Sequence, residues 1–205
     1  VFSFHPVKII TTAEGGLATT NDKELLTRMQ LFRSHGITRN PELMSKLSEG
    51  GWYYQQVDLG FNYRMTELQA ALGVSQMQRL DEFVVKRHSL QERYHSFLKD
   101  FPVVLPFQDQ NNYSALHLYP LQIKLEEVIK GREQIFNELR KENIGVNVHY
   151  IPVHMHPYYL KFGFKEGDFP NSESFYSRAI SIPLFHAMTV EQQDNVLDVL
   201  KRVLK

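Results

Sequence analysis

Hydrophobic residues between positions 66 and 98 recur at three- and four-residue intervals, which is typical of an amphipathic helix. Thr66 followed three residues later by Gln69 forms a capping-box pattern that marks the start of a helix. We therefore predict one long or broken helix that begins there and ends near Asp100. Its second part carries an apolar stripe that we interpret as core: Leu80, Phe83, Val84, Leu90, Tyr94, Phe97 and Leu98.

The first 58 residues contain one further helical pattern. Residues 1–20 are predicted to be extended, with Gly15-Gly16 as the turn between two strands. Asn21 followed by Glu24 is a second capping-box pattern and predicts a helix that ends at Gly36. Residues 37–58 lack clear periodicity, so we expect a long loop there.

The pattern changes after the segment 101–112, which is rich in Pro, Asn and Gln. Such a segment is the best candidate for a domain boundary, and we divide the chain into 1–100 and 101–205. The second part alternates between strand and helix patterns, and this alternation predicts an α/β fold. The predicted elements are strand 113–123, helix 131–142, strand 145–149, a helix from about Ser172, strand 180–184 and a last helix capped by Thr189 with Gln192.

Charge and hydropathy narrow the class of function. The chain has 205 residues with 23 basic and 23 acidic side chains, so no net field attracts nucleic acid or an anionic membrane. No apolar run approaches the roughly 18 residues of a membrane-spanning helix, and the first residues do not resemble a signal peptide. We expect a cytoplasmic protein that binds neither nucleic acid nor membrane.

Metal binding is not expected. The chain has no cysteine, which excludes disulfides and cysteine-zinc sites. His149, His154 and His156 cluster, but their spacing differs from the helical i, i+4 pair of zinc motifs and a proline intervenes. We therefore look for the chemistry of this chain elsewhere.

Lys8 is the strongest candidate for covalent chemistry. It lies between the apolar run VFSFHPV and the β-branched run IITT, where burial can lower the pKa of the amine. A neutral lysine amine serves as nucleophile or base and can bond covalently to a carbonyl group. Position alone favours an ordinary solvated lysine at a strand edge, so a role in covalent chemistry depends on the residues around it.

Those residues resemble a known family. The run SFHPVK at residues 3–8, followed by TTAEGG at 11–16, is similar to the cofactor-lysine segment of the DegT/DnrJ/EryC1/StrS sugar aminotransferases. The resemblance continues through FRSHGITR at 32–39, LGFNYRMTELQAALG at 59–73, HYIPVH at 149–154 and IPLF at 182–185. These ordered blocks span nearly the whole chain. They imply the C-terminal part of a fold-type I pyridoxal-phosphate-dependent transferase, namely the end of its large domain plus a small α/β domain.

The resemblance also implies a cofactor, pyridoxal 5'-phosphate, and roles for individual residues. Lys8 would be the catalytic nucleophile and proton shuttle, and a lysine here, where dehydratase relatives have histidine, favours transamination. Ser3 and Asn62 would bind the cofactor phosphate, Asn62 in the neighbouring subunit of a homodimer. His149, Tyr150 and His154 would line the nucleotide-sugar pocket. Without the motif, Ser3 would be read as a strand serine bonded to the backbone, and with it we favour the phosphate. Taken singly, His149, Tyr150 and His154 could equally be packed in the core.

Within the family, the 32–39 block and the insertion Trp52-Tyr53-Tyr54 look most like the pseudaminic acid branch. That likeness implies a UDP-linked 4-keto-6-deoxy-N-acetylhexosamine as substrate and glutamate as amino donor. Two alternatives stay open: a different nucleotide keto sugar of the perosamine type, or a non-catalytic dimerisation or regulatory module. Family members carry a comparable length of chain before the lysine, so we expect these residues alone to be a poor enzyme.

Overall fold

The computed structural model describes residues 1–205, which form two compact units, Val1–Leu80 and Asp81–Lys205. The long helix predicted from residue 66 is broken into α2 (Glu67–Met77) and α3 (Leu80–Leu98), and nearly all of α3 belongs to the second unit. The division into domains 1–100 and 101–205 stays a prediction.

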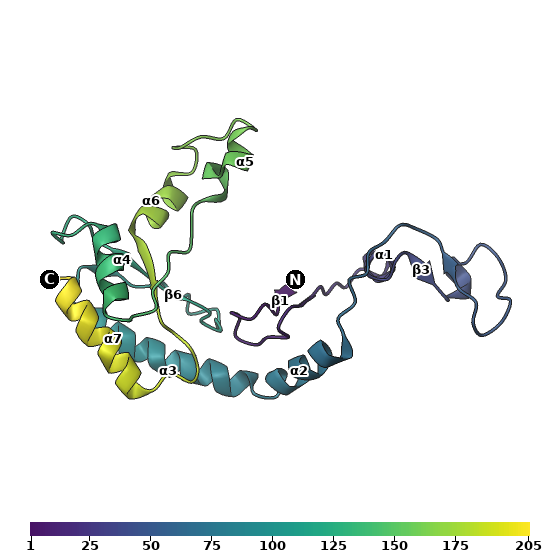
Figure 1. Ribbon diagram of the computed structural model, residues 1–205, viewed down its shortest axis with the longest axis horizontal. Coiled ribbons are helices and arrows are strands. Elements are labelled where there is room, and N and C mark those ends of the chain that lie inside the picture. Colours follow the sequence, from purple (N-terminus) through teal and green to yellow (C-terminus); the bar gives the residue numbers. More distant parts are fainter. The chain divides into compact units, whose positions relative to one another are not determined.

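The first unit begins with two short paired strands and a helix (Figure 1). Strand β1 (Phe2–Ser3) pairs antiparallel with β2 (Gly16–Leu17). Helix α1 (Lys23–Arg33) begins one residue later than predicted, because the side chain of Asp22 accepts the amide hydrogens of Glu24 and Leu25. The predicted capping box at Asn21 is therefore wrong, although the helix itself is confirmed.

The segment 37–58 is more ordered than the predicted loop. Strand β3 (Ile37–Thr38) pairs antiparallel with β4 (Gln55–Gln56), and a short 3-10 helix, η1 (Pro41–Leu43), lies between them. Two-residue strands are too short to produce a visible alternation of polar and apolar positions. The capping box that opens α2 is confirmed, since Thr66 and Gln69 exchange both of its hydrogen bonds.

The second unit is built around a three-stranded antiparallel sheet in the order β5-β6-β7. Its strands are β5 (Val103–Val104), β6 (Tyr119–Ile123) and β7 (Ala179–Ile182). Pro120 is tolerated in the central strand because β5 pairs only with Gln122 and Ile123, which leaves the edge beside Pro120 without a neighbour. The predicted strand 113–123 is thus shortened, and residues 145–149 contribute one isolated bridge between Asn147 and Ser181.

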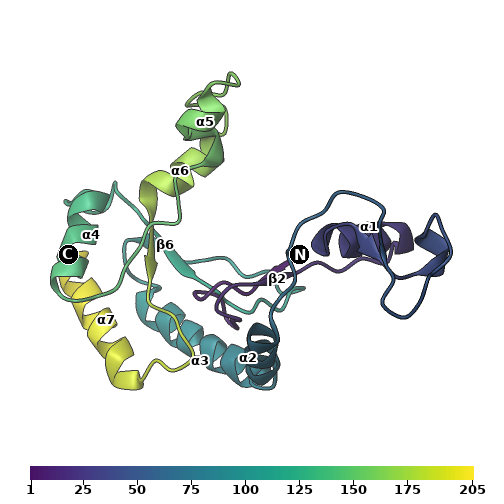
Figure 2. The same ribbon diagram turned by 45° about the vertical axis from the view of Figure 1, so that its right-hand side comes forward.

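Helices cover the sheet of the second unit. They are α4 (Arg132–Lys141), α6 (Pro170–Arg178) and α7 (Val190–Val203), together with the short η2 (Val153–Met155) and α5 (Pro157–Leu160). The predicted capping box of Thr189 with Gln192 at the start of α7 is confirmed. Figure 2 shows α4 and α7 side by side, and shows α5 on a segment that extends beyond α6, away from the sheet.

All buried hydrophobic side chains belong to the second unit, from Phe83 to Leu204. The buried Arg87 on α3 donates to the carbonyl oxygens of Leu116, His117 and Leu184. The hydroxyl of Tyr94 donates to the carbonyl of Pro183 at 2.9 Å, and burial raises the pKa of this phenol. These polar contacts fix the segment after β7 against α3.

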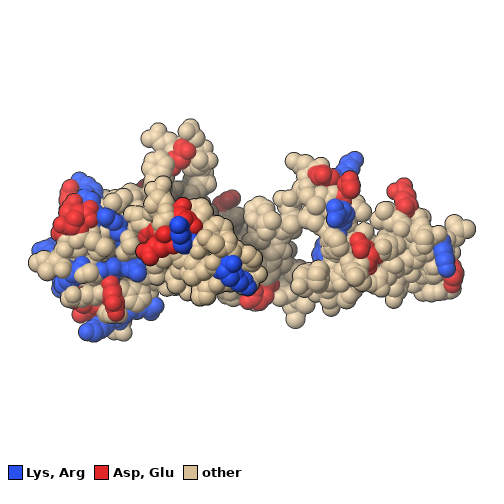
Figure 3. Space-filling view, turned by 90° about the horizontal axis from the view of Figure 1, so that it is seen from above, with Lys and Arg blue, Asp and Glu red and all other residues tan.

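The surface carries both signs of charge. Basic and acidic side chains are interspersed on the face drawn in Figure 3. None of the helices combines the length and the apolar composition needed to cross a membrane.

Candidate functional site

The loop that carries Lys8 is closed by backbone hydrogen bonds. The amide of Phe4 donates to the carbonyl of Gly15 at 2.9 Å, and the amide of Thr12 donates to the carbonyl of Phe4 at 3.0 Å. Inside this closure the amide of Lys8 donates to the carbonyl of His5 at 2.9 Å and forms a turn. Gly15 therefore closes the loop, and Gly16 lies in β2 rather than in the predicted tight turn.

Thr12 anchors this loop against α2. Its side chain is 2 % exposed, and its hydroxyl donates to the carbonyl of Glu14 at 2.8 Å. A Cβ atom on Gly73 of α2 would lie 2.8 Å from the Thr12 methyl group, and one on Gly15 would lie 2.2 Å from its hydroxyl oxygen. The two glycines thus allow the close approach. Sequence reasoning missed Thr12 and Gly73 as positioning residues, because a glycine within a helix gives no indication of what packs on it.

Ser3 is the last residue of β1, and Lys8 lies within the loop that follows it. The Ser3 hydroxyl accepts only a long hydrogen bond of 3.5 Å from the amide of His5. Lys8 is half-buried, and its amine has neither an ion-pair nor a hydrogen-bond partner. Both groups are therefore available to a ligand.

Asn62 lies before α2 and is exposed. Its backbone forms an isolated bridge with Ser34, beyond the end of α1, while its carboxamide makes no hydrogen bond. No hydrogen bond joins Asn62 to Ser3 or Lys8 within the chain. Ser3 thus lies at the end of β1 and Lys8 on the loop that follows it, while Asn62 is on a different segment, before α2.

A second group of polar side chains lies in the C-terminal unit. The Nδ1 atom of His149 is 2.9 Å from the hydroxyl oxygen of Ser181 on β7. Tyr150 is 64 % exposed, and its ring lies 5.8 Å from that of His156. His149 and Tyr150 therefore present an imidazole and a phenol on one short segment.

His154 faces a different partner. Its ring is 7 % exposed, packs 4.7 Å from the ring of Phe169 and places Nε2 2.7 Å from the carboxylate of Glu173. The same carboxylate accepts the amide hydrogens of Gly167 and Phe169. His154 thus joins η2 to α6. No group of three or more His, Asp or Glu side chains is arranged to hold a metal ion.

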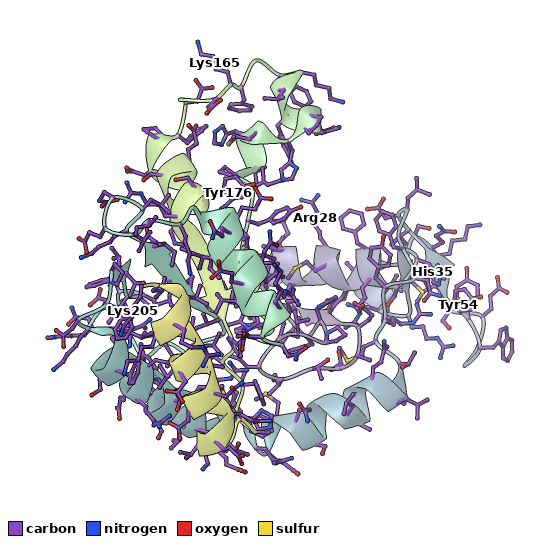
Figure 4. All side chains as sticks on the ribbon, turned by 60° about the vertical axis from the view of Figure 1, so that its left-hand side comes forward. Arg28, His35, Tyr54, Lys165, Tyr176 and Lys205 are labelled. Carbon is purple, nitrogen blue, oxygen red and sulfur yellow. The ribbon has the colours of Figure 1, made fainter.

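Glu173 is therefore a hub that sequence reasoning missed. The hydrogen bond from His154, supported by the backbone amides, holds the pKa of this carboxyl below its ordinary value of 4.5. Figure 4 shows the rest of this region, with Lys165 at the outer end of the segment and Tyr176 on α6. The guanidinium of Arg132 lies 4.8 Å above the Tyr176 ring and joins α6 to α4.

Replacement of Glu173 by glutamine should lower the melting temperature at neutral pH. The NH2 group of the glutamine side chain is a donor, and it would face the N–H donors whose hydrogen bonds the carboxylate now accepts. A carboxyl group whose pKa is lower in the folded state than in the unfolded state stabilises the fold at pH values above its unfolded-state pKa. This stabilisation is lost as the pH falls through the folded-state pKa. The difference in melting temperature between wild type and Glu173→Gln should hence shrink below pH 4.5. Thermal unfolding followed by circular dichroism at several pH values measures it.

Glu142→Gln is the matched control. Glu142 pairs with Arg202 at the surface, where both side chains are more than half exposed, so its replacement should change stability little. Equal losses in the two variants, or a Glu173→Gln effect that does not depend on pH, would contradict the role of the hub.

The arrangement of elements matches solved enzymes. The structure superposes on PseC of Helicobacter pylori, described as an aminotransferase involved in the biosynthesis of pseudoaminic acid, with a TM-score of 0.87 and 31 % identity. The match covers 99 % of this chain and 52 % of that one. The chain thus corresponds to the C-terminal half of a fold-type I pyridoxal-phosphate-dependent aminotransferase.

The sequence family agrees with this class. The chain belongs to the DegT/DnrJ/EryC1/StrS aminotransferase family, whose model matches residues 1–201. It is 38 % identical over 207 residues to the spore coat polysaccharide biosynthesis protein SpsC of Bacillus subtilis, covering 100 % of this chain and 53 % of SpsC. It is 35 % identical over 207 residues to the UDP-4-amino-4,6-dideoxy-N-acetyl-beta-L-altrosamine transaminase of Campylobacter jejuni strain 81-176, covering 100 % of this chain and 52 % of that enzyme.

The chain therefore spans about half the length of the curated relatives it matches. The family depends on pyridoxal phosphate. The free amine of Lys8, the weakly engaged hydroxyl of Ser3 and the unengaged amide of Asn62 fit the aldehyde and the phosphate of that group. When bound, pyridoxal phosphate acts as an electron sink for carbanion chemistry.

Proposed function

We propose that this chain supplies the cofactor lysine of an aminotransferase that acts on a nucleotide-linked keto sugar. The observation that supports this most is Lys8, whose unpaired amine lies on a loop closed by backbone bonds in a chain that matches the family over residues 1–201. Lys8 acts as the nucleophile that joins the cofactor, and then holds and moves the proton at its Nζ atom.

The proposed reaction moves an amino group from glutamate to C4 of a UDP-linked 4-keto-6-deoxy-N-acetylhexosamine and releases 2-oxoglutarate. The names of the Campylobacter and Helicobacter relatives support this sugar class. His149 and Tyr150 contact the nucleotide sugar, since an exposed phenol and a half-buried imidazole suit hydroxyl and diphosphate oxygens. His154 contributes by fixing the same segment through Glu173.

The complete enzyme is proposed to be a cytoplasmic homodimer. Ser3 binds the cofactor phosphate of its own subunit, and Asn62 binds that of the neighbour, which fits an exposed carboxamide that makes no bond within its own chain. The residues that relatives carry beyond the matched half complete the cofactor pocket.

A second sugar is the main alternative. SpsC is 38 % identical to this chain and the Campylobacter transaminase 35 %, and the name of SpsC refers to spore coat polysaccharide without naming a sugar. This similarity favours testing nucleotide keto sugars other than the pseudaminic acid precursor, perosamine-type sugars included. A non-catalytic dimerisation or regulatory role is the outcome if no sugar is turned over.

In the test, the complete enzyme is incubated with glutamate and with each of a panel of UDP- and dTDP-linked keto sugars. The release of 2-oxoglutarate is then measured. We expect turnover of the UDP-linked 4-keto-6-deoxy-N-acetylhexosamine well above that of the other sugars. Preference for another sugar would show that the proposed substrate is wrong, while the proposed amino-transfer reaction would stand. Absence of turnover across the panel, in protein that retains pyridoxal phosphate, would overturn the proposed activity.

A further inference from the structure

Ser181 is a polar residue in an otherwise apolar strand. Strand β7 has the sequence AISI, and all four residues are buried, with Ser181 5 % exposed. A buried hydroxyl without a hydrogen-bond partner destabilises a protein, so a serine here requires one.

The main chain fixes the position of Ser181. Its amide donates to the carbonyl of Asn147 at 2.7 Å, and its carbonyl accepts the amide of Asn147 at 3.1 Å. On the other side β7 faces β6, where Pro120 is opposite Ser181. The Cα of Ser181 is thus held between β6 and the 147–149 segment, and its side chain is placed by the sheet rather than by a loop.

The hydroxyl of Ser181 has one side-chain partner, Nδ1 of His149 at 2.9 Å. If Nδ1 carried the proton, the serine O–H would remain buried without an acceptor. If the serine O–H donates to Nδ1, both groups are satisfied and the imidazole proton is on Nε2. The side-chain NH2 group of Asn147 is a donor that would favour the opposite tautomer, but it lies 3.5 Å from Nε2, at the limit of a hydrogen bond, and Asn147 is exposed to water. The buried hydroxyl therefore decides the tautomer.

We propose that Ser181 is a positioning residue that holds His149 in the Nε2–H form, so that the outer nitrogen donates to an oxygen of the nucleotide sugar. The contact with the sugar rests on the proposed function, whereas the tautomer does not. A hydrogen-bond donor on a ring fixed from a β-strand recognises an acceptor, either a sugar hydroxyl or a diphosphate oxygen, without a change in protonation.

The tautomer is tested by ¹⁵N NMR of the imidazole groups in the 205-residue chain. The His149 resonances are assigned by their loss in His149→Gln. We expect the Nε2–H form in the wild type, a mixture of tautomers in Ser181→Ala and retention of Nε2–H in Ser181→Thr, which keeps the hydroxyl. An Nδ1–H form in the wild type overturns the proposal and requires no variant.

The sugar contact is tested in the complete enzyme. Ser181→Ala should raise the KM for the nucleotide sugar about 3- to 10-fold, with kcat and the KM for glutamate nearly unchanged, and Ser181→Thr should restore the KM. Ser177→Ala is the control, since the exposed Ser177 hydroxyl bonds only within its helix. If Ser181→Ala changes the tautomer but not the KM for the nucleotide sugar, the proposed contact with the sugar is wrong. An equal fall in kcat for all substrates would also contradict that contact. If no sugar is turned over at all, the proposed function fails while the NMR result still decides the tautomer.

Discussion

Replacement of Lys8 by alanine is expected to lower the amino-transfer rate of the complete enzyme by at least roughly 10³-fold. The side chain would lose both of its roles, the covalent link to the cofactor and the movement of a proton, and no second lysine is present on the 4–15 loop. Treatment with pyridoxal phosphate and borohydride should attach the cofactor at Lys8 in the wild type and leave Lys8→Ala unlabelled. Mass spectrometry of the peptides measures this directly.

Two further variants separate chemistry from charge and folding. Lys8→Arg keeps a cation but cannot form the link, so it should also remain unlabelled. Lys46→Ala removes an exposed lysine of the same unit and should leave labelling and rate unchanged. Labelling that persists at another lysine in Lys8→Ala would show that the assignment of the cofactor lysine is wrong. A normal rate in Lys8→Ala would rule out any role for this residue in catalysis.

The helices were predicted well where a local signal defines them. Thr66 with Gln69 and Thr189 with Gln192 form the expected capping boxes, because this interaction lies within one turn. The strands were predicted less well. Strands β3, β4 and β5 have two residues each, and such short pairs depend on partners far along the chain. The antiparallel order of the sheet likewise cannot be derived from an alternation of strands and helices.

The candidate site divides in the same way. Lys8 was identified from a contiguous motif, and the structure places it on a loop closed by backbone hydrogen bonds. Glu173 and Ser181 were missed because each acts through a histidine 19 or 32 residues away, a relation that only the folded chain shows. Sequence therefore indicates the residues of the chemistry more readily than those that position them.

A domain consisting of residues 81–205 is expected to fold without the first 80 residues, whereas residues 1–80 alone should remain largely unfolded. Every buried hydrophobic side chain lies in the second unit, where one cluster joins the sheet to α3, α4 and α7. The first unit buries no hydrophobic side chain, and Leu68, Val74 and Met77 of α2 are more than half exposed. Without buried apolar area a chain cannot offset the conformational entropy lost on folding.

The first unit carries an uncovered apolar surface. A cavity of about 510 Å³ lies between the Lys8 loop and α2, and its lining is mostly apolar. Such a surface requires cover, and we expect the part of the enzyme that relatives carry beyond the matched half to supply it. The loop with Lys8 would then be ordered only in the complete enzyme, which gives a physical reason for expecting these residues alone to be inactive.

Amide hydrogen exchange and thermal unfolding distinguish the two units. In the 205-residue chain, amides of β6, α4 and α7 should exchange far more slowly than those of α1 and α2. Leu139→Ala should destabilise residues 81–205 by about 2–5 kcal/mol, and by the same amount in the longer chain, because Leu139 is fully buried in the second unit. Leu72→Ala on the partly exposed α2 is the control and should not shift this transition. Strong protection of α2 in the isolated chain would contradict the argument, since it would require a core within the first 80 residues that the structure does not contain.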